Sequence, residues 1–262
     1  MLSKILLPAM LAIFSIVSGL PTADPVDNVE LFKRDDVLTD RDLELASLHG
    51  VDSMPSVTKR SPAAFKHAVI RRDNGDDITI WVHRSFVEER DPSLSGPLTE
   101  RQVRPWDKFR PSTYPWSPRL SCTYYTHVDK TNSTSPLADS AAYLATWAKN
   151  TNGMFAAVSY TTPQGVIVWD TWSDFVVAGT NSGGNAVFSV GFPGSTRGQT
   201  AAVLTANIFD LVDHSHTHFK RKYGSTWRVE AEGKATCYQA IASHQNVPGL
   251  ASWRLTGTKA VV

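Results

Sequence analysis

The second half of the chain changes from alternating to helical hydrophobic periodicity. Residues 123–128 combine aromatic and β-branched side chains, which predicts a strand. Ser135 and Pro136 then predict a helix start, because Ser caps free backbone N–H groups and Pro fits the first helical position. An apolar stripe marks one face of this helix, which Asn152-Gly153 is expected to end. The stripe consists of Leu137, Ala141, Leu144, Trp147 and Ala148.

Short strands are expected after this helix. Residues 154–161 and 166–169 are predicted strands, and the Pro- and Gly-containing segment 162–165 is typical of a hairpin turn between them. A Gly-rich loop over 179–185 then leads into a further strand over 186–192.

A second helix is predicted over residues 200–223, where apolar side chains again recur at helical spacing. The cations of Lys220-Arg221-Lys222 suit the negative end of its dipole, and Gly224 is expected to terminate it. Residues 226–229 continue as a strand toward Cys237, and 250–255 would add an edge strand. The apolar stripe of this second helix consists of Leu204, Ile208, Leu211, Ser215 and Phe219.

The resulting element order is β-α-β-β-β-α-β. It predicts an α+β fold in which an antiparallel sheet carries two helices on one face, a split β-α-β sandwich. Cys122 and Cys237 bracket this region and are the only cysteines of the chain. In an oxidising export route we expect them to form one disulfide, with two separate thiols as the alternative.

The beginning of the chain predicts export. An apolar run over residues 5–17 follows Lys4, and small side chains at 18–19 precede an expected cut, so 1–19 has the pattern of a secretory signal peptide. The run is too short to cross about 30 Å of hydrocarbon. We therefore expect a secreted, extracellular protein without a stable membrane anchor.

Charges of both signs are concentrated before residue 122, with 16 Lys or Arg and 17 Asp or Glu. This composition predicts a disordered pro-region over 20–60 and a charged, Pro-rich linker or second pro-segment over 61–121, with a possible strand at 78–82. The globular domain is expected over 122–262. Three dibasic pairs are candidate processing sites, and Lys59-Arg60 is the preferred one because a polar run precedes it. These pairs end at Arg34, Arg60 and Arg72.

Three short motifs mark the second half: Ser-Pro-Leu-Ala-Asp-Ser at 135–140, Ala-Val-Phe-Ser-Val at 186–190, and Lys-Ala-Thr-Cys at 234–237. Over about residues 122–240 the chain resembles the fungal necrosis-inducing-factor family of secreted effectors. Members are homologues of an extracellular virulence protein and are similar to killer toxins. The family has two further cysteines where this chain has Ser140 and Ala186.

The resemblance implies a fungal, non-enzymatic effector or toxin-like protein that acts through surface contacts on an unidentified target of host or competitor cells. The formal net charge of +1 argues against nucleic-acid binding. Asn132-Ser133-Thr134 is a glycosylation sequon in a polar loop, so Asn132 is a candidate glycan site, with an unoccupied sequon as the alternative.

Asp210, His214 and His218 share one face of the second predicted helix. His214 and His218 could bind a metal with an outside ligand, but all three side chains could not, because the outer two are about 12 Å apart. The simpler interpretation, which we prefer, is that these three side chains form a solvated polar face of the helix. A pH-sensitive contact with an anionic surface, formed with His216 and the Lys220-Arg221-Lys222 run, is the functional variant. We predict no resident metal or other cofactor.

Asp170 and Asp174 flank Trp172, and carboxylates beside an aromatic ring are typical of sugar-processing sites. The alternative function is therefore a secreted hydrolase or carbohydrate-binding module that uses these three residues. The simpler interpretation is two surface carboxylates beside a packed strand. Ser195 lies outside a nucleophile-elbow motif. We predict no catalytic residue and expect the protein not to be an enzyme.

Overall fold

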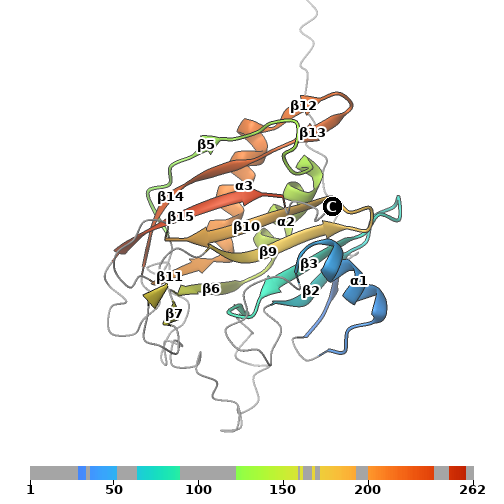
Figure 1. Cartoon of the computed structure of the whole chain (residues 1–262), viewed down its shortest axis with the longest axis horizontal. Coiled ribbons are helices and arrows are strands. Elements are labelled where there is room, and N and C mark those ends of the chain that lie inside the picture. The colour runs from blue at the N-terminus through green and yellow to red at the C-terminus, as the bar shows by residue number, and fades with distance from the viewer. Residues whose placement is uncertain are drawn as a thin grey trace, which may run out of the picture.

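The computed structural model describes residues 29–33, 36–51, 64–88, 122–158, 160–161, 167–168, 172–192, 200–238 and 248–257. An eight-stranded antiparallel sheet forms the centre of the molecule (Figure 1). In spatial order its strands are β1 (Val29–Leu31), β2 (Ala64–Ile70), β3 (Ile78–His83), β9 (Trp172–Thr180), β10 (Asn185–Gly191), β15 (Pro248–Thr256), β14 (Ala231–Tyr238) and β5 (Val128–Asp129).

Three helices and three smaller sheets accompany it. The helices are α1 (Asp40–Leu48), α2 (Ala138–Asn150) and α3 (Thr205–Phe219). One small sheet contains β11 (Thr200–Leu204), β6 (Gly153–Val158) and β4 (Val87–Glu88). The other two are the pairs β12 (Arg221–Tyr223) with β13 (Thr226–Arg228), and β7 (Tyr160–Thr161) with β8 (Ile167–Val168).

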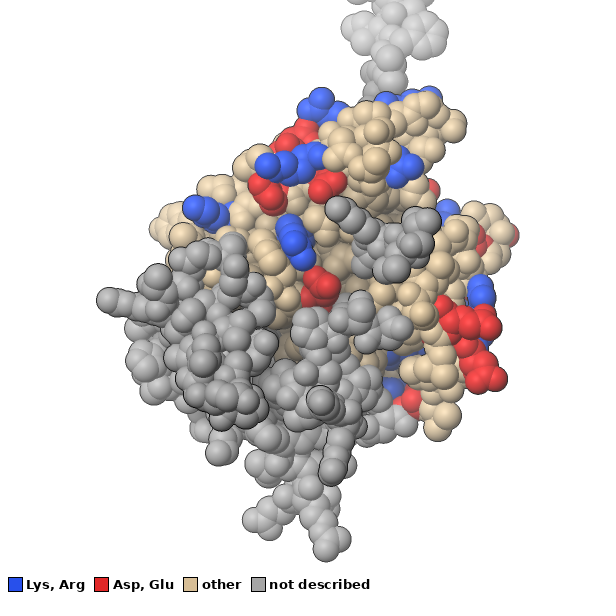
Figure 2. Space-filling model, in the orientation of Figure 1, with Lys and Arg blue, Asp and Glu red and all other residues tan. Residues whose placement is uncertain are grey.

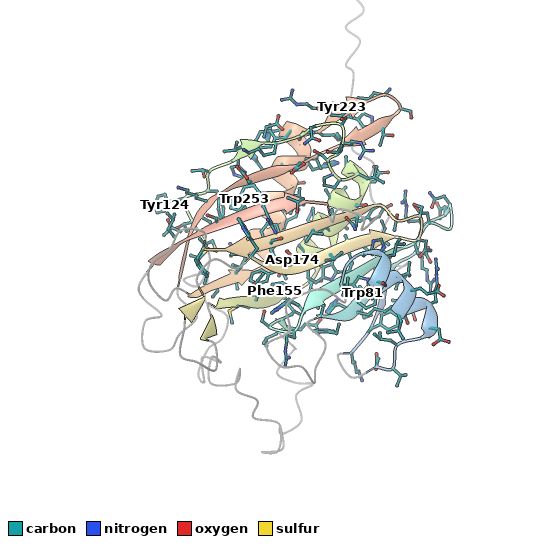
Figure 3. The ribbon with its side chains drawn as sticks, viewed as in Figure 1. Trp81, Tyr124, Phe155, Asp174, Tyr223 and Trp253 are labelled. Carbon is teal, nitrogen blue, oxygen red and sulfur yellow. A yellow bond between two sulfur atoms is a disulfide. The ribbon has the colours of Figure 1, made fainter. Side chains whose placement is uncertain are left out.

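Both faces of the main sheet are packed. Side chains alternate along a strand, and Ile80 of β3 belongs to the core beneath α2 and α3, whereas its neighbour Trp81 belongs to a second cluster with Leu45 of α1. Helix α2 packs along α3 and contacts β9 and β10. Figure 3 shows Trp81 on the side of α1. Each face of the sheet therefore has its own apolar core.

The predicted antiparallel α+β fold and its disulfide are confirmed: Cys122 and Cys237 are bonded to each other. The prediction of two helices on one face is incomplete, because α1 covers part of the opposite face. The α2 stripe is confirmed at four positions that are almost fully buried. These are Ala141, Leu144, Trp147 and Ala148.

The fold begins much earlier in the chain than composition suggests. Strand β3, from the segment assigned to a linker, pairs with β9 in the middle of the sheet, and α1 lies within the range assigned to a disordered pro-region. Some of the charges that biased that assignment lie in the turn 71–77, while β3 itself, which includes the possible strand predicted at 78–82, is buried along its whole length. The domain boundary predicted at residue 122 is therefore wrong.

The strand expected over 123–128 is restricted to Val128–Asp129. Tyr124 adopts a φ of 53°, which breaks the extended conformation. The backbone N–H groups of Thr123 and Thr126 still donate to the carbonyls of Thr236 and Lys234, at 2.8 and 2.9 Å. The segment 122–127 thus lies along β14 without joining it as a regular strand.

Helix starts also differ from the prediction. The residue before α2 is Leu137, whose side chain makes no capping bond, and the Ser135 hydroxyl instead donates to Glu230 at 2.7 Å. Helix α3 begins only at Thr205, because residues 200–204 form β11 paired with β6. The Asn207 side-chain oxygen accepts the backbone N–H of Leu204 at 3.0 Å and so fixes this start.

The end of the second helix differs as well. Residues 221–223 form β12 rather than a last helical turn, and Gly224, with a φ of +61°, is in the β12–β13 turn. Residues 250–255 belong to β15, which lies between β10 and β14 and is not an edge strand. The Gly-rich loop is confirmed as a shorter turn, since β9 extends to Thr180. The turn predicted over 162–165 lies outside the described residues.

Candidate functional site: a histidine cluster beside helix α3

Three imidazole rings lie close together, tilted against one another, where α3 meets the edge of the main sheet. The ring centroids of His127 and His214 are 3.9 Å apart at an interplanar angle of 30°. His214 and His218, one helical turn apart on α3, are separated by 4.4 Å. His127 comes from the segment that precedes β5, so the cluster joins two elements that are far apart in sequence.

Aromatic side chains surround the inner end of the cluster. Trp253 of β15 meets His127 edge-on at 5.3 Å, and Phe219 meets His214 edge-on at 5.7 Å. The Nδ1 atom of His127 is buried and has no hydrogen-bond partner among the described residues. A ring nitrogen without a partner is an unfavourable place for a proton, because the resulting N–H would lose its hydrogen bond to water.

Burial and mutual proximity both oppose protonation of the cluster. The pKa of His127 is lowered first by burial and then by the positive charges that His214 and His218 would carry. The pKa of His214 is also lowered, by burial and by His218, with Asp213 acting weakly in the opposite direction. This close arrangement is therefore the one expected when the rings of His127 and His214 are neutral.

The acidic groups nearest the cluster do not neutralise it. Burial and the neighbouring Asp213 raise the pKa of Asp210, which opposes its ionisation. Tyr125 has a raised pKa because of burial and the charge of Asp210, and its hydroxyl accepts a hydrogen bond from Asn207 at 2.9 Å. His214 and His218 are thus neighbours as their spacing predicted, but Asp210 is not part of the cluster.

Among the residues that the structure describes, no three His, Cys, Asp or Glu side chains are placed to hold a metal ion. The rings of His127 and His214 are inclined at 30°, and those of His214 and His218 at 43°. His216 is buried away from them, and its pKa is lowered by burial and by Lys220. Sequence analysis missed His127, because no local spacing relates it to α3.

The alternative site on the sheet shows a different arrangement from a sugar cleft. The Arg254 guanidinium lies 4.4 Å from the Trp172 ring centroid and occupies one ring face. The Ser189 hydroxyl donates to the Asp174 carboxylate at 2.5 Å, and Figure 3 places Asp174 in the middle of the sheet. Asp170 lies outside the described residues, as does Ser195, so the pairing of two carboxylates stays a prediction.

Asn132 is exposed in the loop before α2, as its sequon predicted. Its side-chain oxygen accepts from the Thr134 backbone N–H at 2.8 Å and from the Thr134 hydroxyl at 2.6 Å. A cavity of about 550 Å³ lies beside it. The polar groups lining the cavity already bind one another, for example Ser135 with Glu230 at 2.7 Å and with Arg228 at 2.5 Å.

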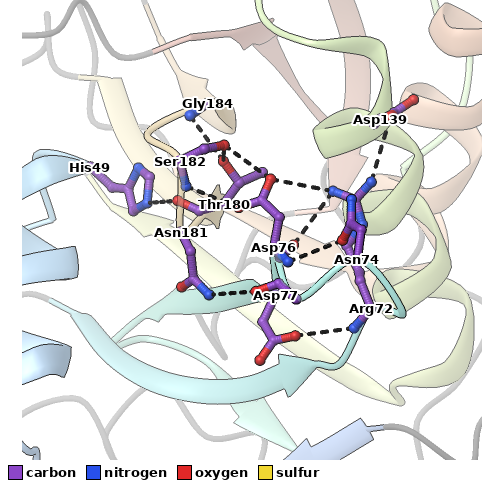
Figure 4. A network of polar contacts seen from close by, with 11 residues as sticks. His49, Arg72, Asn74, Asp76, Asp77, Asp139, Thr180, Asn181, Ser182 and Gly184 are labelled. Carbon is purple, nitrogen blue, oxygen red and sulfur yellow. Dashed lines mark hydrogen bonds and ion pairs between the residues drawn. The ribbon is translucent and has the colours of Figure 1, made fainter.

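The turns that follow β2 and β9 bind each other through a polar network (Figure 4). Asp76 accepts both the backbone N–H and the hydroxyl of Ser182 at 2.9 Å, and the Thr180 hydroxyl accepts the Gly184 N–H at 3.0 Å. His49, at the end of α1, donates from Nε2 to the Thr180 carbonyl at 3.0 Å. These bonds hold the N-terminal segment to the β9–β10 hairpin.

Arg72, the last residue of the third dibasic pair, belongs to the same network. Its backbone N–H donates to Asp77 at 3.1 Å, and its guanidinium lies 3.7 Å from Asp76 and 3.8 Å from Asp139. Arg34 and Arg60 lie outside the described residues, so cleavage after them stays a prediction, as does the signal peptide at 1–19. Within the described residues, no helix has the length and apolar character needed to cross a bilayer.

Comparison with known proteins adds no relative to this picture. No protein-family model matches the chain, and no curated protein matches it either. The likeness to necrosis-inducing factors therefore stays a prediction from the motifs at 135–140, 186–190 and 234–237.

Proposed function

We propose that this is a secreted, non-enzymatic effector or toxin-like protein that contacts the surface of host or competitor cells, and that acid strengthens this contact. The observation that carries the proposal is the cluster of His127, His214 and His218 at the sheet edge. The pKa values of His127 and His214 are lowered, and adjacent imidazoles convert a fall in pH into a local gain of positive charge.

The consequence of protonation follows from the geometry. Like charges on rings about 4 Å apart repel, so acid drives His127 away from α3. The segment that carries His127 is tied by the Cys122 disulfide on one side and by β5 pairing on the other. The backbone N–H groups of Thr123 and Thr126 also donate to β14. The displacement is therefore confined to the His127 side chain and its surroundings, and it changes one patch of the surface without unfolding the domain.

The sign of the pH effect is set by the direction of the shifts. Because the pKa values of His127 and His214 are lowered, both rings are neutral near pH 7 and become charged only below the usual histidine value of about 6.5. A contact with an anionic cell surface should thus strengthen as the pH falls through and below that value.

NMR titration of the histidine C2–H signals tests the cluster directly in the unaltered protein. We expect the assigned signals of His127 and His214 to titrate below the usual value, and His214→Gln to raise the pKa of His127 because it removes a like charge. His216→Gln is the matched control, since it removes one imidazole from α3 outside the cluster. Ordinary titration of all three cluster rings would contradict the proposal.

Cell death tests the function. Purified protein should kill leaf tissue or competitor yeast more effectively at pH 5.5 than at pH 7.5, and His214→Gln should lose more of this pH dependence than His216→Gln. Thermal melts of both variants verify that each is folded at both pH values. An absence of cell death in both cell types, or an equal pH response of the two variants, would refute the proposed function.

A further inference from the structure

The β12–β13 hairpin projects from the end of α3, next to the histidine cluster (Figure 1). Its two-residue loop, Gly224-Ser225, has a positive φ at the first position, which suits a tight hairpin with Gly leading. The register pairs Lys222 with Trp227, and Arg221 with Arg228. Because side chains alternate along each strand, these two pairs lie on opposite faces of the hairpin.

The inner face fixes the hairpin to the body of the protein. The Tyr223 hydroxyl donates to the Thr131 carbonyl at 3.0 Å, and the Arg221 guanidinium is bound to the Asp129 carboxylate. The residue after β13 is also fixed, since the Val229 N–H donates to the Pro136 carbonyl at 3.1 Å. Figure 3 shows Tyr223 beside the turn of this hairpin, so the bond to Thr131 holds the turn end of the projection. The hairpin is a rigid platform rather than a loose loop.

The outer face carries Lys222, Trp227 and, from the residue before β12, Lys220. Trp227 is 48% exposed, a large value for an indole, and the Lys220 ammonium lies 5.6 Å from its ring centroid. No ion pair links Lys220 or Lys222 to any residue that the structure describes. Figure 2 shows basic side chains over this end of the molecule, with acidic side chains among them.

An exposed indole on the same hairpin face as two lysines without ion-pair partners among the described residues fits the interface of an anionic membrane. The ring has an apolar body and a polar N–H, so it partitions to the headgroup level, while each lysine is attracted by anionic lipid. Because Lys220, Lys222 and Trp227 lie on the same face of the hairpin, all three side chains can contact a flat surface at the same time. The face offers a shallow, reversible contact and no spanning segment.

We propose that the outer face of the β12–β13 hairpin docks on the anionic headgroups of a lipid bilayer through Lys220, Lys222 and Trp227. This names the partner of the surface contact and in that respect rests on the proposed function. The docking charges are present at neutral pH, however, whereas the histidine charges appear only in acid. The two ideas can therefore be tested separately.

The test is sedimentation of the purified protein with vesicles of phosphatidylcholine containing phosphatidylserine, at pH 7.5. Lys220→Ala with Lys222→Ala should weaken binding about thirtyfold, at about 1 kcal/mol per cation near such a surface. The charge-matched control is Lys149→Ala with Lys234→Ala, which removes two exposed lysines elsewhere and should change binding little. Trp227→Ala should also weaken binding, and brominated lipid should quench fluorescence in the unaltered protein but less in Trp227→Phe.

Binding to uncharged vesicles and binding to a soluble acidic polysaccharide are measured to separate the alternative partners. Equal binding to vesicles of phosphatidylcholine alone, or an equal loss in both lysine pairs, would overturn the assignment of the hairpin. Binding to soluble polygalacturonate without binding to anionic vesicles would likewise overturn it, because the partner would then be an acidic polysaccharide. Failure of vesicle binding, with the signals of His127 and His214 still titrating below the usual value, would leave the acid response intact and remove only this inference.

Discussion

Acid should destabilise the fold chiefly through His67, which lies in β2 and is 3% exposed. The Trp147 indole N–H donates to Nδ1 of His67 at 3.1 Å, so the ring proton is on Nε2, which faces a Glu88 oxygen at 3.8 Å. Protonation would place a second N–H against the Trp147 N–H in a pocket closed by Phe86. Burial accordingly lowers the pKa of His67 to about 4.

This shift has a defined sign and size. The unfolded chain takes up a proton near pH 6.5, whereas the folded protein resists it until about pH 4, so stability is complete above that window and falls as the pH drops through it. At about 1.4 kcal/mol per pKa unit, His67 contributes a loss of about 3 kcal/mol between neutral pH and pH 4.

Urea denaturation at several pH values from about 7 to 4 measures the slope of the unfolding free energy. His67→Gln keeps an amide oxygen that can accept from Trp147, and it removes the titrating ring. The variant should be less stable than the parent at neutral pH but should lose about 3 kcal/mol less on acidification. An unchanged pH slope in the variant would refute the assignment of this proton uptake to His67.

The remaining predictions concern the disulfide, a close packing contact, the glycan and processing. Cys237→Ser opens a loop with a separation of 115 residues and should cost up to about 5 kcal/mol, seen as a lower melting temperature than that of the parent. Gly179→Ala should cost about 1–3 kcal/mol in urea unfolding, because its Cβ would lie 2.3 Å from the buried His49 ring. Asn132→Gln should abolish the mass shift that glycosidase treatment gives in secreted protein, and an unchanged shift would assign the glycan elsewhere. A dibasic-specific protease should cut after Arg72 only in denatured protein, since ion pairs hold this turn, and mass spectrometry of the native digest checks it.

The spacing of apolar residues predicted helices and strands correctly where burial of one face of the element determines its secondary structure. The α2 stripe and strand β10 follow from apolar spacing and turn residues, and both are found, whereas β9 was not predicted. The same reasoning extended α3 through residues 200–204, because a strand rich in Ala and Val and a helix look alike over five residues. Only pairing with β6, a tertiary interaction, distinguishes them.

The composition of longer segments was a poor guide to domain limits. The charge-rich composition led residues 64–70, which form β2, to be assigned to a linker. The possible strand predicted at 78–82 is β3, which pairs with β2 and with β9. Only part of the candidate site could be predicted from the sequence, because one of its residues is brought there by tertiary packing. The spacing of His214 and His218 follows from the helix, whereas His127 approaches them only because Gly233 of β14 allows the Thr126 carbonyl to come close, at 1.8 Å from where a Cβ would be.

The entry of β2 and β3 into the centre of the sheet has a consequence for maturation by proteolysis. Both cysteines lie at or after residue 122, so no covalent cross-link would retain an N-terminal fragment released by a cut after Arg60. Residues 29–51 would nevertheless stay bound, through β1 pairing with β2 and α1 packing on Trp81. A nicked molecule would then behave as a non-covalent heterodimer, migrating as two bands in denaturing gels and eluting as one species in native chromatography.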